Sequence, residues 1–353
     1  IHPEISYNTI TFDTTSIRDY FYMFEAYGTY GSDPDTIWMV GNKFKVNANN
    51  SASTFYSYCY FSDFYPADAL IMANNEFYVP YKSNLGYAYL EFYYCDNIHF
   101  INNSFLSYLN SAYINLDYGS GKLVMKNNNL VNLAGGDLLT FNGRTVTESD
   151  YNNVYSSGLS LSSWKSATAQ DTHSVSMSPY FLNPSVNLNL LDDGGLECPR
   201  DTLVMRDIDS TLRNSLTSMG AYQVTSVNNN ITPRTLVSPA AVSITGNSTP
   251  VTVTILNAGL NTITSMNVHW IVNGVVRTTY PWTGTLASKA SVNVNLGSFI
   301  PLADSNMIIV YTSMPNGMTD AVPMNDTLRY YTKGCDSLLH GTYIVNNDNQ
   351  LNN

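Results

Sequence analysis

The chain has 353 residues and a formal net charge of −11; 12% of its residues are charged and 44% are hydrophobic. Tyrosine is frequent, at 27 copies, and Asn, Ser and Thr supply much of the other polarity, a composition typical of extended β-sheet proteins rather than helical enzymes. The 16 lysines and arginines form no cluster, which argues against nucleic acid as a partner, and no apolar run of about 18 residues could insert into a membrane as a helix.

An asparagine set between apolar residues recurs through the first half of the sequence, at spacings of 25 to 34 residues: Asn8, Asn42, Asn75, Asn103, Asn128 and Asn153. Apolar residues stand three positions before it: Ile5, Met39, Met72, Phe100 and Met125. Others stand two positions after it: Ile10, Phe44, Phe77, Phe105 and Leu130, with Tyr155 as a weaker last member. Asparagine tolerates a left-handed backbone and its amide can satisfy local backbone groups, so we expect each one at a bend, bonded to its neighbours in a ladder.

The spacing around each asparagine predicts strands. Four repeats carry a further apolar residue five positions before the asparagine, which gives the two-residue period of a strand. Repeats of about 25 residues with several short strands indicate a stacked solenoid. We therefore predict an all-β fold in which residues 1–225 form a right-handed parallel β-helix, with loops 28–35 and 47–54 projecting from it. Aromatic strands such as GYAYLEFYY allow an outward tyrosine-rich face.

Two segments beyond residue 170 carry a further pattern. They contain Asp171, Ser174, Pro179 and Phe181, and then Asp207-Ile208-Asp209, Arg213 and Gly220-Ala221-Tyr222-Gln223. Together they resemble the D-x-x-S…P-x-F and DIDG-x-x-R…DIGAYE segments that end the β-helix in secreted repeat proteins of Bacteroidetes. The sequence departs from that pattern at Ser210, Met219 and Gln223. The resemblance implies an ending of the helix rather than an active site.

A second module follows a polar linker at 226–234. Its short alternating strands include a hairpin signal at Asn273-Gly274, and about seven strands in about 100 residues are typical of an immunoglobulin-like sandwich. We assign this sandwich to residues 230–333. The set VTILNAG, VHWIVNG, WTGTL and PNGMTDAVPMNDT resembles the cell-adhesion-related bacterial domain called CARDB, a mostly non-catalytic family that spaces or presents other domains on secreted proteins.

The final residues suggest that the chain continues a series. The stretch CDSLLHGTYIV resembles the opening of the next β-helix unit in such arrays, so residues 334–353 are assigned to the start of a further repeat unit. We expect the sequence to be an internal or processed piece of a longer protein.

Some parallel β-helices cleave polysaccharides, and glycoside hydrolysis needs two convergent carboxylates. Asp192-Asp193 could be half of such a set, but companion GHG and RxK signatures are missing, and a turn is the preferred interpretation. Asp117, Lys122 and Arg144 lie on successive repeats, which leaves a lyase open.

Three histidines were candidates for chemistry. Asp171, His173 and Ser174 have the residue types of a catalytic triad, but neighbours on a strand point to opposite faces, which argues against a nucleophile–base–orienter chain. His99 stands between two inward positions and is expected to face solvent. His269 lies in a sandwich strand, where a structural role is expected.

No cofactor is expected, although Asp207 and Asp209 could contribute to a structural Ca²⁺ site. The cysteines lack zinc-ligand spacing and leave open one or two disulfides or buried free thiols: Cys59, Cys95, Cys198 and Cys335.

A modification motif adds to the resemblance. The Bacteroidetes O-glycosylation pattern, Asp-Ser/Thr followed by a small or aliphatic residue, occurs more often than the one or two copies, roughly, expected by chance. Its sites are Thr14, Thr36, Thr202, Ser210, Thr327 and Ser337. The resemblance thus implies an O-glycosylated surface protein.

These features favour a non-catalytic structural or adhesive segment of a large secreted cell-surface or filament protein. Its expected partners are other copies or neighbouring repeats of the same protein, together with carbohydrate or cell-surface ligands. The alternatives are a carbohydrate-active β-helix, lyase or hydrolase, with an accessory sandwich, and a carbohydrate-binding module. Charges converging in one groove would favour the enzyme, and an aromatic strip along one face would favour the binding module.

Overall fold

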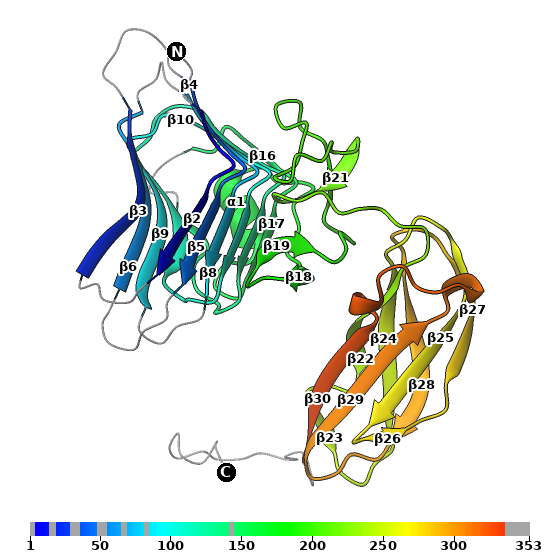
Figure 1. The fold of residues 1–353 in the computed structure, drawn as a ribbon. Helices are drawn as coiled ribbons and strands as arrows, with labels where there is room; N and C mark the ends of the chain where they lie inside the picture. The colour runs from blue at the N-terminus through cyan, green and yellow to red at the C-terminus, as the bar shows by residue number, and fades with distance from the viewer. Residues whose placement is uncertain are drawn as a thin grey trace, which may run out of the picture. The chain divides into compact units, whose positions relative to one another are not determined.

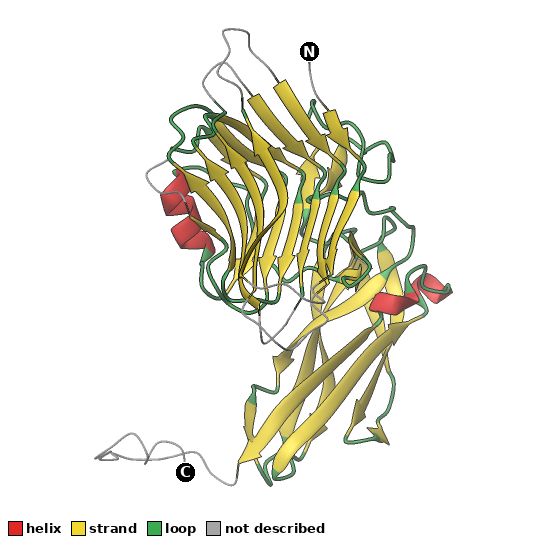
Figure 2. Cartoon of the chain, turned by 60° about the vertical axis from the view of Figure 1, so that its left-hand side comes forward, coloured by secondary structure: helices red, strands yellow, loops and turns green. Residues whose placement is uncertain are grey.

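The computed structural model describes residues 4–13, 19–28, 36–47, 55–64, 69–80, 85–140 and 145–335. The chain divides into two compact units, residues 1–225 and 226–353, and each is described by itself (Figure 1). Strands dominate both units, and the described residues contain one α-helix, α1 (Leu161–Thr168) (Figure 2). The fold is therefore nearly all-β, as predicted. The loops predicted at 28–35 and 47–54 fall almost wholly outside the described residues.

Three parallel sheets build the first unit, and each coil of three successive strands adds one strand to each sheet. Sheet A contains β1 (Glu4–Ser6), β4 (Thr36–Val40), β7 (Ala69–Ala73), β10 (Asn97–Ile101), β13 (Leu123–Lys126) and β16 (Glu148–Asp150). Sheet B contains β2 (Thr9–Asp13), β5 (Lys43–Asn47), β8 (Glu76–Val79), β11 (Ser104–Ser107), β14 (Asn129–Asn132) and β17 (Asn153–Ser156). Sheet C contains β3 (Asp19–Tyr27), β6 (Phe55–Ser62), β9 (Leu85–Tyr93), β12 (Ala112–Asp117) and β15 (Leu139–Thr140).

The apolar columns expected from the repeat line the interior of the coils. In sheet A the register partners are Met39, Met72, Phe100 and Met125. In sheet B they are Phe44, Phe77, Phe105 and Leu130, and the Phe44 and Phe77 rings stack at 4.9 Å. All eight side chains are at most 4% exposed, so each contributes roughly 1.5–3 kcal/mol of burial free energy. The last member of the sheet B column is Val154, at 0% exposure, and the expectation of Tyr155 is wrong.

Each passage from sheet A to sheet B combines a left-handed residue with a ladder asparagine. The left-handed residues have φ between 54° and 69°: Tyr7, Gly41, Asn74, Asn102, Asn127 and Tyr151. The ladder residue comes directly after them, and its Nδ2 donates to Oδ1 of the next ladder residue at 2.9–3.3 Å, through Asn8, Asn42, Asn75, Asn103, Asn128 and Asn152. The sixth ladder residue is thus Asn152, and its assignment to Asn153 is wrong by one position. The left-handed conformation belongs to the residue before the ladder asparagine.

The last coil ends in a helix instead of a third strand. Ser160 caps α1, because its Oγ accepts a hydrogen bond from Ser163 N at 3.1 Å. Trp164 on this helix is 0% exposed and belongs to the same core as the coils. The helix therefore buries apolar surface at the final coil, a role that the sequence pattern did not predict.

A closing segment, residues 175–224, packs on the outer faces of sheets A and B. It contains two antiparallel strand pairs: β18 (Phe181–Asn183) with β19 (Asn187–Leu190), and β20 (Glu197–Pro199) with β21 (Leu216–Ser218). On sheet B, Leu188 and Tyr222 share a buried cluster with Leu106 and Val131. On sheet A, Val204 clusters with the outward residues of three coils. The sequence predicted only that this segment ends the coils. In the structure it also packs along their outer faces.

In the doublets 74–75, 102–103 and 127–128 the first asparagine bonds the closing segment, and in 152–153 the second one does. Asn74 Nδ2 donates to the Arg206 carbonyl at 2.6 Å, and Asn127 Nδ2 donates to the Pro199 carbonyl at 2.8 Å. Gly220 N donates in turn to the Asn127 carbonyl at 2.7 Å. Within a doublet, one asparagine thus bonds along the interior ladder and the other bonds the closing segment outside.

Two buried charges complete the attachment. Glu76, at 0% exposure, accepts hydrogen bonds from Tyr222 Oη at 2.5 Å and Leu188 N at 3.0 Å, and lies 3.4 Å from Lys45 Nζ. Arg213, also 0% exposed, donates to Asn74 Oδ1 at 2.7 Å. Burial lowers the pKa of Arg213 to about 10.

The second unit consists of two antiparallel-rich sheets around one apolar core. The first sheet has β22 (Ile231–Ser238), β24 (Thr249–Asn257) and β28 (Ser291–Phe299). The second has β23 (Val242–Ile244), β30 (Thr327–Cys335), β29 (Asp304–Ser313), β25 (Ile263–Val272), β26 (Val275–Val276) and β27 (Tyr280–Leu286). Two 3₁₀ turns, η1 (Pro315–Gly317) and η2 (Pro323–Asn325), precede β30. Trp270, Val253 and Val310 lie in the core at 4% exposure or less, and the predicted hairpin at Asn273-Gly274 joins β25 to β26.

Among the described residues, no helix has the length and apolarity needed to cross a membrane. All four cysteines are free thiols, and Cys59, Cys95 and Cys198 are buried. Of the two alternatives left open by the sequence, disulfides or buried free thiols, the structure has the free thiols. Burial raises the pKa of the Cys198 thiol to about 12, so it stays protonated.

Candidate functional site

A row of tyrosines lies on the outer side of sheet C, and we call Tyr27, Tyr60, Tyr93, Tyr94 and Tyr118 the tyrosine face. Their rings form a connected series, with centroids 6.1 Å apart for Tyr27 and Tyr60, 6.5 Å for Tyr60 and Tyr93, and 5.5 Å for Tyr93 and Tyr118. Tyr27, Tyr94 and Tyr118 are 57%, 43% and 59% exposed. The face is thus an aromatic strip that crosses four coils.

Strand alternation produces this strip. In β6 and β9 the inward Phe61, Leu90 and Phe92 are buried, so Tyr60 and Tyr93 project outward. Tyr94 and Tyr118 occupy left-handed turn positions directly after β9 and β12, with φ of 51° and 52°, and their rings stack at 5.5 Å. The register repeats the aromatic position only for Tyr94 and Tyr118, which directly follow the register partners Tyr93 and Asp117, whereas Tyr60 lies opposite Glu25 and Glu91 and contacts Tyr27 and Tyr93 diagonally.

Polar groups accompany the rings. Glu91 is the register partner of Tyr60 on one side and of Asn115 on the other. Asn115 accepts a hydrogen bond from Thr140 Oγ1 at 2.6 Å. Tyrosine combines a flat apolar ring with a polar hydroxyl and loses little conformational entropy on binding. Rings beside a carboxylate and an amide can bind a ligand that has both apolar faces and hydroxyl groups.

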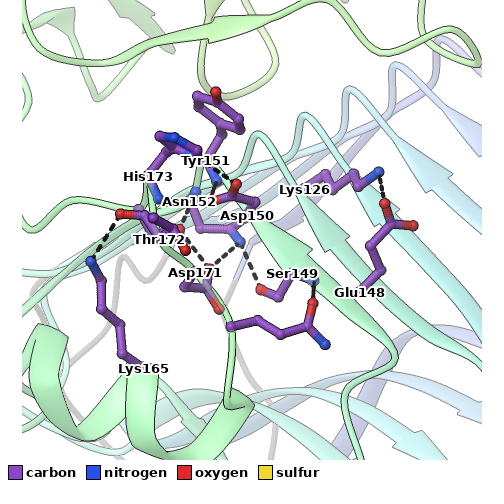
Figure 3. A network of polar contacts seen from close by, with 12 residues as sticks. Lys126, Glu148, Ser149, Asp150, Tyr151, Asn152, Lys165, Asp171, Thr172 and His173 are labelled. Carbon is purple, nitrogen blue, oxygen red and sulfur yellow. Dashed lines mark hydrogen bonds and ion pairs between the residues drawn. The ribbon is translucent and has the colours of Figure 1, made fainter.

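A second candidate is a polar groove of about 630 Å³ beside the last coils. We call it the charged groove, and Figure 3 shows much of its side-chain network. It is lined by Lys126, Asn127, Glu148, Ser149, Asp150, Tyr151, Ala169, Gln170, Asp171, Thr172, Pro199, Arg200, Asp201 and Thr202. Five ionisable side chains besides Asp171 and Tyr151 therefore meet at one concave surface, where the coils adjoin the closing segment.

Two pairs of ionisable side chains lie at the groove. Lys126 forms an ion pair with Glu148, and His173 Nδ1 lies 2.7 Å from Asp150 Oδ2 (Figure 3). The His173 ring also stacks on Tyr151, with centroids 4.7 Å apart. Partial burial raises the pKa of Asp150, but hydrogen bonds from the side chain and backbone of His173 outweigh it, so this pKa lies below its ordinary value. Asp150 therefore remains ionised.

Asp171 and Ser174 end the asparagine ladder. Asp171 Oδ1 accepts from Asn152 Nδ2 at 3.1 Å and from Ser174 Oγ at 2.5 Å, while Ser174 Oγ accepts from Asn152 N at 2.8 Å. His173 points instead to Asp150, so the three triad-type residues form no catalytic chain. The D-x-x-S motif substitutes for the next asparagine that a further coil would have supplied.

The other catalytic candidates do not converge. Asp192 and Asp193 form a turn, in which Gly194 N donates to Asp192 Oδ1 at 3.1 Å and Ser218 Oγ donates to Asp193 Oδ2 at 3.2 Å. Lys122 is exposed, whereas the Asp117 side chain and Arg144 lie outside the described residues. The structure therefore brings no described member of either set to the charged groove.

The remaining histidines have structural surroundings. His269 bonds Thr279 Oγ1 and Ser313 Oγ, both at 2.9 Å, and stacks on Tyr311 at 4.5 Å. His99 projects from the outer face of sheet A but is half-buried, and burial and the Lys122 charge lower its pKa. The expectation of a solvent-facing His99 is therefore only partly right.

Asp207 is fully engaged with the backbone around it. Its Oδ1 accepts from Asp209 N at 3.0 Å and Thr211 N at 2.7 Å, and its Oδ2 accepts from Gln223 N at 2.9 Å. Asp209 is instead exposed, 3.9 Å from Lys43 Nζ. The two carboxylates therefore do not share one cation site. Within the described ranges, no group of three or more His, Cys, Asp or Glu side chains could hold a metal ion.

The glycosylation motifs fall at varied positions. Thr202, Ser210 and Thr327 are exposed, and Thr36 is half-buried at the start of β4. Ser210 has φ 65°, which explains why the related pattern has glycine there. Thr14 and Ser337 lie outside the described residues.

Sequence reasoning missed the charged groove. Its signal was present, because Glu148 and Asp150 are two residues apart on one strand and therefore share a face. Their partners Lys126 and His173, and the lining residue Arg200, come from other segments, and only the folded chain brings them to the same place.

No family model matches the chain, and no curated protein matches it. Among solved structures, a domain described as part of a cell surface protein of Methanosarcina acetivorans is 25% identical, covers 33% of this chain and 100% of that one, and has a TM-score of 0.29. The CARDB domain of a Pyrococcus furiosus protein, in complex with di-metal ions, is 15% identical, covers 32% of this chain and 95% of that one, and has a TM-score of 0.28. A solution structure of the same domain is 17% identical, covers 31% and 99%, and has a TM-score of 0.27. The chain is thus similar in part to CARDB and cell-surface domains.

Proposed function

We propose that the chain is a non-catalytic structural and adhesive segment of a secreted surface protein of the Bacteroidetes type, in which a right-handed parallel β-helix precedes a CARDB-like sandwich. The helix serves as a rigid support, and its tyrosine face binds carbohydrate. Coils stabilise one another through nearest neighbours, so such a support extends by adding repeats.

The tyrosine face carries this proposal. Outward residues of several coils on sheets A and B are buried under the closing segment, whereas Tyr27, Tyr94 and Tyr118 on sheet C stay 43–59% exposed. Exposed aromatic rings in contact with one another mark an interaction surface more strongly than scattered apolar residues do. The −11 net charge and the neutral rings favour an uncharged polysaccharide over a polyanion.

Binding of the intact chain to insoluble and soluble polysaccharides tests the proposal. Tyr93→Ala combined with Tyr118→Ala is expected to reduce retention at least tenfold. Tyr331→Ala is the matched control, since Tyr331 is 60% exposed on β30 of the second unit. Equal retention of the two variants, or no retention of the parent by any polysaccharide in a broad panel, would contradict carbohydrate binding by this face.

The charged groove favours one alternative, a carbohydrate-active enzyme. Glu148 and Asp150 share a strand face beside Lys126 and Arg200, and hydrolysis requires two such carboxylates. A general acid needs a raised pKa, however, while Asp150 has a lowered one and Glu148 is paired with Lys126. Release of reducing ends by the parent chain, abolished by Glu148→Gln, would establish the enzyme instead.

Secretion and O-glycosylation belong to the same proposal. The exposed motif sites Thr202, Ser210 and Thr327 are the strongest acceptors. An intact mass equal to that of the bare chain, measured on natively purified protein, would remove this element.

A further inference from the structure

The turn before β30 buries two carboxylates in the second unit. Asp320 is 6% exposed and Asp326 is 9% exposed. They stand on either side of η2 (Pro323–Asn325), six residues apart, close enough for Asp320 to act electrostatically on Asp326. Asp320 is the charged group that acts on Asp326, and it has the same sign.

Backbone contacts fix this turn against the beginning of β22. Asp320 Oδ2 accepts from Ile231 N at 2.8 Å, and its Oδ1 accepts from Val322 N at 2.8 Å. Thr232 Oγ1 donates to the Asn325 carbonyl at 2.7 Å. These bonds hold two chain segments, separated by about 90 residues, at a defined distance from each other.

Oδ1 of Asp326 and Oδ1 of Asn230 are buried oxygens without a hydrogen-bond partner, and Asn230 is 2% exposed. Asn230 directly precedes Ile231, whose amide binds Asp320. Side chains two residues apart on an extended chain lie on the same side, so Asn230 projects toward the turn, as Thr232 does. The Asn230 oxygen is thus a second, independent sign of a missing partner, a hydrogen-bond donor or a cation.

Burying two carboxylates together is unfavourable unless a cation or a proton compensates them. Burial raises the pKa of both, and Asp320 raises that of Asp326 further, to about 8. A bound proton satisfies one carboxyl oxygen at most, and it leaves the Asn230 oxygen unaccounted for. A metal ion satisfies several oxygens at once.

We propose that Asp320, Asp326 and Asn230 form a binding site for a divalent cation, and specifically for Ca²⁺. The donors are oxygens alone, carboxylate and amide, which is the ligand set that Ca²⁺ takes, and backbone carbonyls and water would complete its six to eight positions. The ion fixes the start of β22, at the junction with the first unit in sequence, to the turn that leads into β30.

Thermal unfolding of the whole chain tests the site, with protein stripped by EDTA and then titrated with Ca²⁺ or Mg²⁺ at pH 7.5. We expect Ca²⁺ to raise the melting temperature of the second unit by several degrees at millimolar concentration and Mg²⁺ to have a smaller effect. Terbium luminescence, sensitised by the unit's tryptophans and tyrosines, should report the same site and be displaced by Ca²⁺.

Asp326→Asn is the decisive variant. It removes an uncompensated buried charge, so the stripped variant should fold at least as well as the parent while losing the Ca²⁺ shift and the terbium signal. Asp304→Asn, at an exposed aspartate of the same unit, should keep both. No Ca²⁺ shift in the parent, or a shift of equal size in Asp326→Asn, would overturn the site. In the first case, stability that falls steadily as the pH rises would identify a shared proton as the occupant.

Discussion

The outer faces of the coils differ from one another. On sheets A and B, the outward residues of several coils are buried by the closing segment, including the charged Glu76 and the apolar Leu106. On sheet C, the outward residues are tyrosines that remain partly or largely exposed. The same strand repeat therefore builds a sealed side and an open one.

The residues on the two sides match these different tasks. The sealed side contains buried charges, and each has specific partners: Lys45 and Tyr222 for Glu76, and Asn74 for Arg213. The open side contains neutral rings that tolerate water at one edge and a ligand at the other. Sealing is thus a stability device, and the open face is free to act in binding.

Removing Arg213 should have the largest effect, because Arg213 is one of two fully buried charges on the sealed side. Arg213→Ala leaves Asn74 Oδ1 without its donor and the Gly220 carbonyl with only the long 3.4 Å contact from Asn102, and each buried acceptor left unsatisfied costs about 1–3 kcal/mol. Urea unfolding and hydrogen exchange of the closing segment measure this loss. Arg206→Ala is the control, since Arg206 is exposed and bonds only locally, to the Ser210 carbonyl. Comparable losses in both variants would show that Arg213 has no special role.

The two members of an asparagine doublet should differ in how much stability is lost when each is replaced. Asn103→Ala breaks bonds to the Met72 carbonyl and to Asn128 and leaves Asn75 unsatisfied, a loss of about 1–3 kcal/mol for the buried groups. Asn102→Gly preserves the left-handed backbone and loses only two long bonds to the closing segment, of 3.4 and 3.5 Å, so its effect should be smaller. The midpoints of denaturant unfolding compare the two variants, provided that the dependence of the unfolding free energy on denaturant concentration stays the same. A larger effect of Asn102→Gly would mean that the bond to the closing segment stabilises the fold more than the ladder does.

Much of the coil architecture could be predicted from the sequence, because the same pattern recurs in several repeats. The apolar columns and five ladder asparagines follow from spacing alone. The error at the last coil arose where the repeat weakens: Ser149 replaces an apolar residue, and Asn152 and Asn153 offer two registers. The correct register is set by bonds to Asp171 and Ser174, which no spacing encodes.

The packing of the closing segment on sheets A and B, and the assembly of the charged groove, could not be predicted from the sequence for a related reason. Glu76 stands at an outward position and reads as a solvent-facing acid, yet it is 0% exposed, because Leu188 and Tyr222 cover it from more than 100 residues away. Alternation predicts which face a residue occupies. It cannot predict whether another segment then covers that face.

Asp326 in the second unit gives a further comparison. Unlike Glu76, which lies beside Lys45, this buried carboxyl lies beside another acid, so the stability of the unit should depend on pH. The pKa of Asp326 is raised from 3.8 to about 8, by burial and by Asp320, so folding favours its protonated form. Stability from this group is complete below about pH 4 and is lost as the pH rises to about 8. Melting temperatures in EDTA from pH 4 to 9 should follow that decline, and Asp326→Asn should flatten it. A flat profile for the parent would mean that Asp326 is compensated by another group.

Changes on the open face should affect stability least. Tyr118→Ala removes a side chain that is 59% exposed and loses only ring contacts at its edges, so the free energy of unfolding should fall by about 1 kcal/mol or less. Phe92→Ala, on the inward side of the adjacent strand at 0% exposure, should lower it by about 3–5 kcal/mol. Should Tyr118→Ala prove as damaging as Phe92→Ala, the stacked rings would be a second ladder that holds the coils together. A small loss of stability together with a large loss of polysaccharide binding would instead assign these rings to ligand binding.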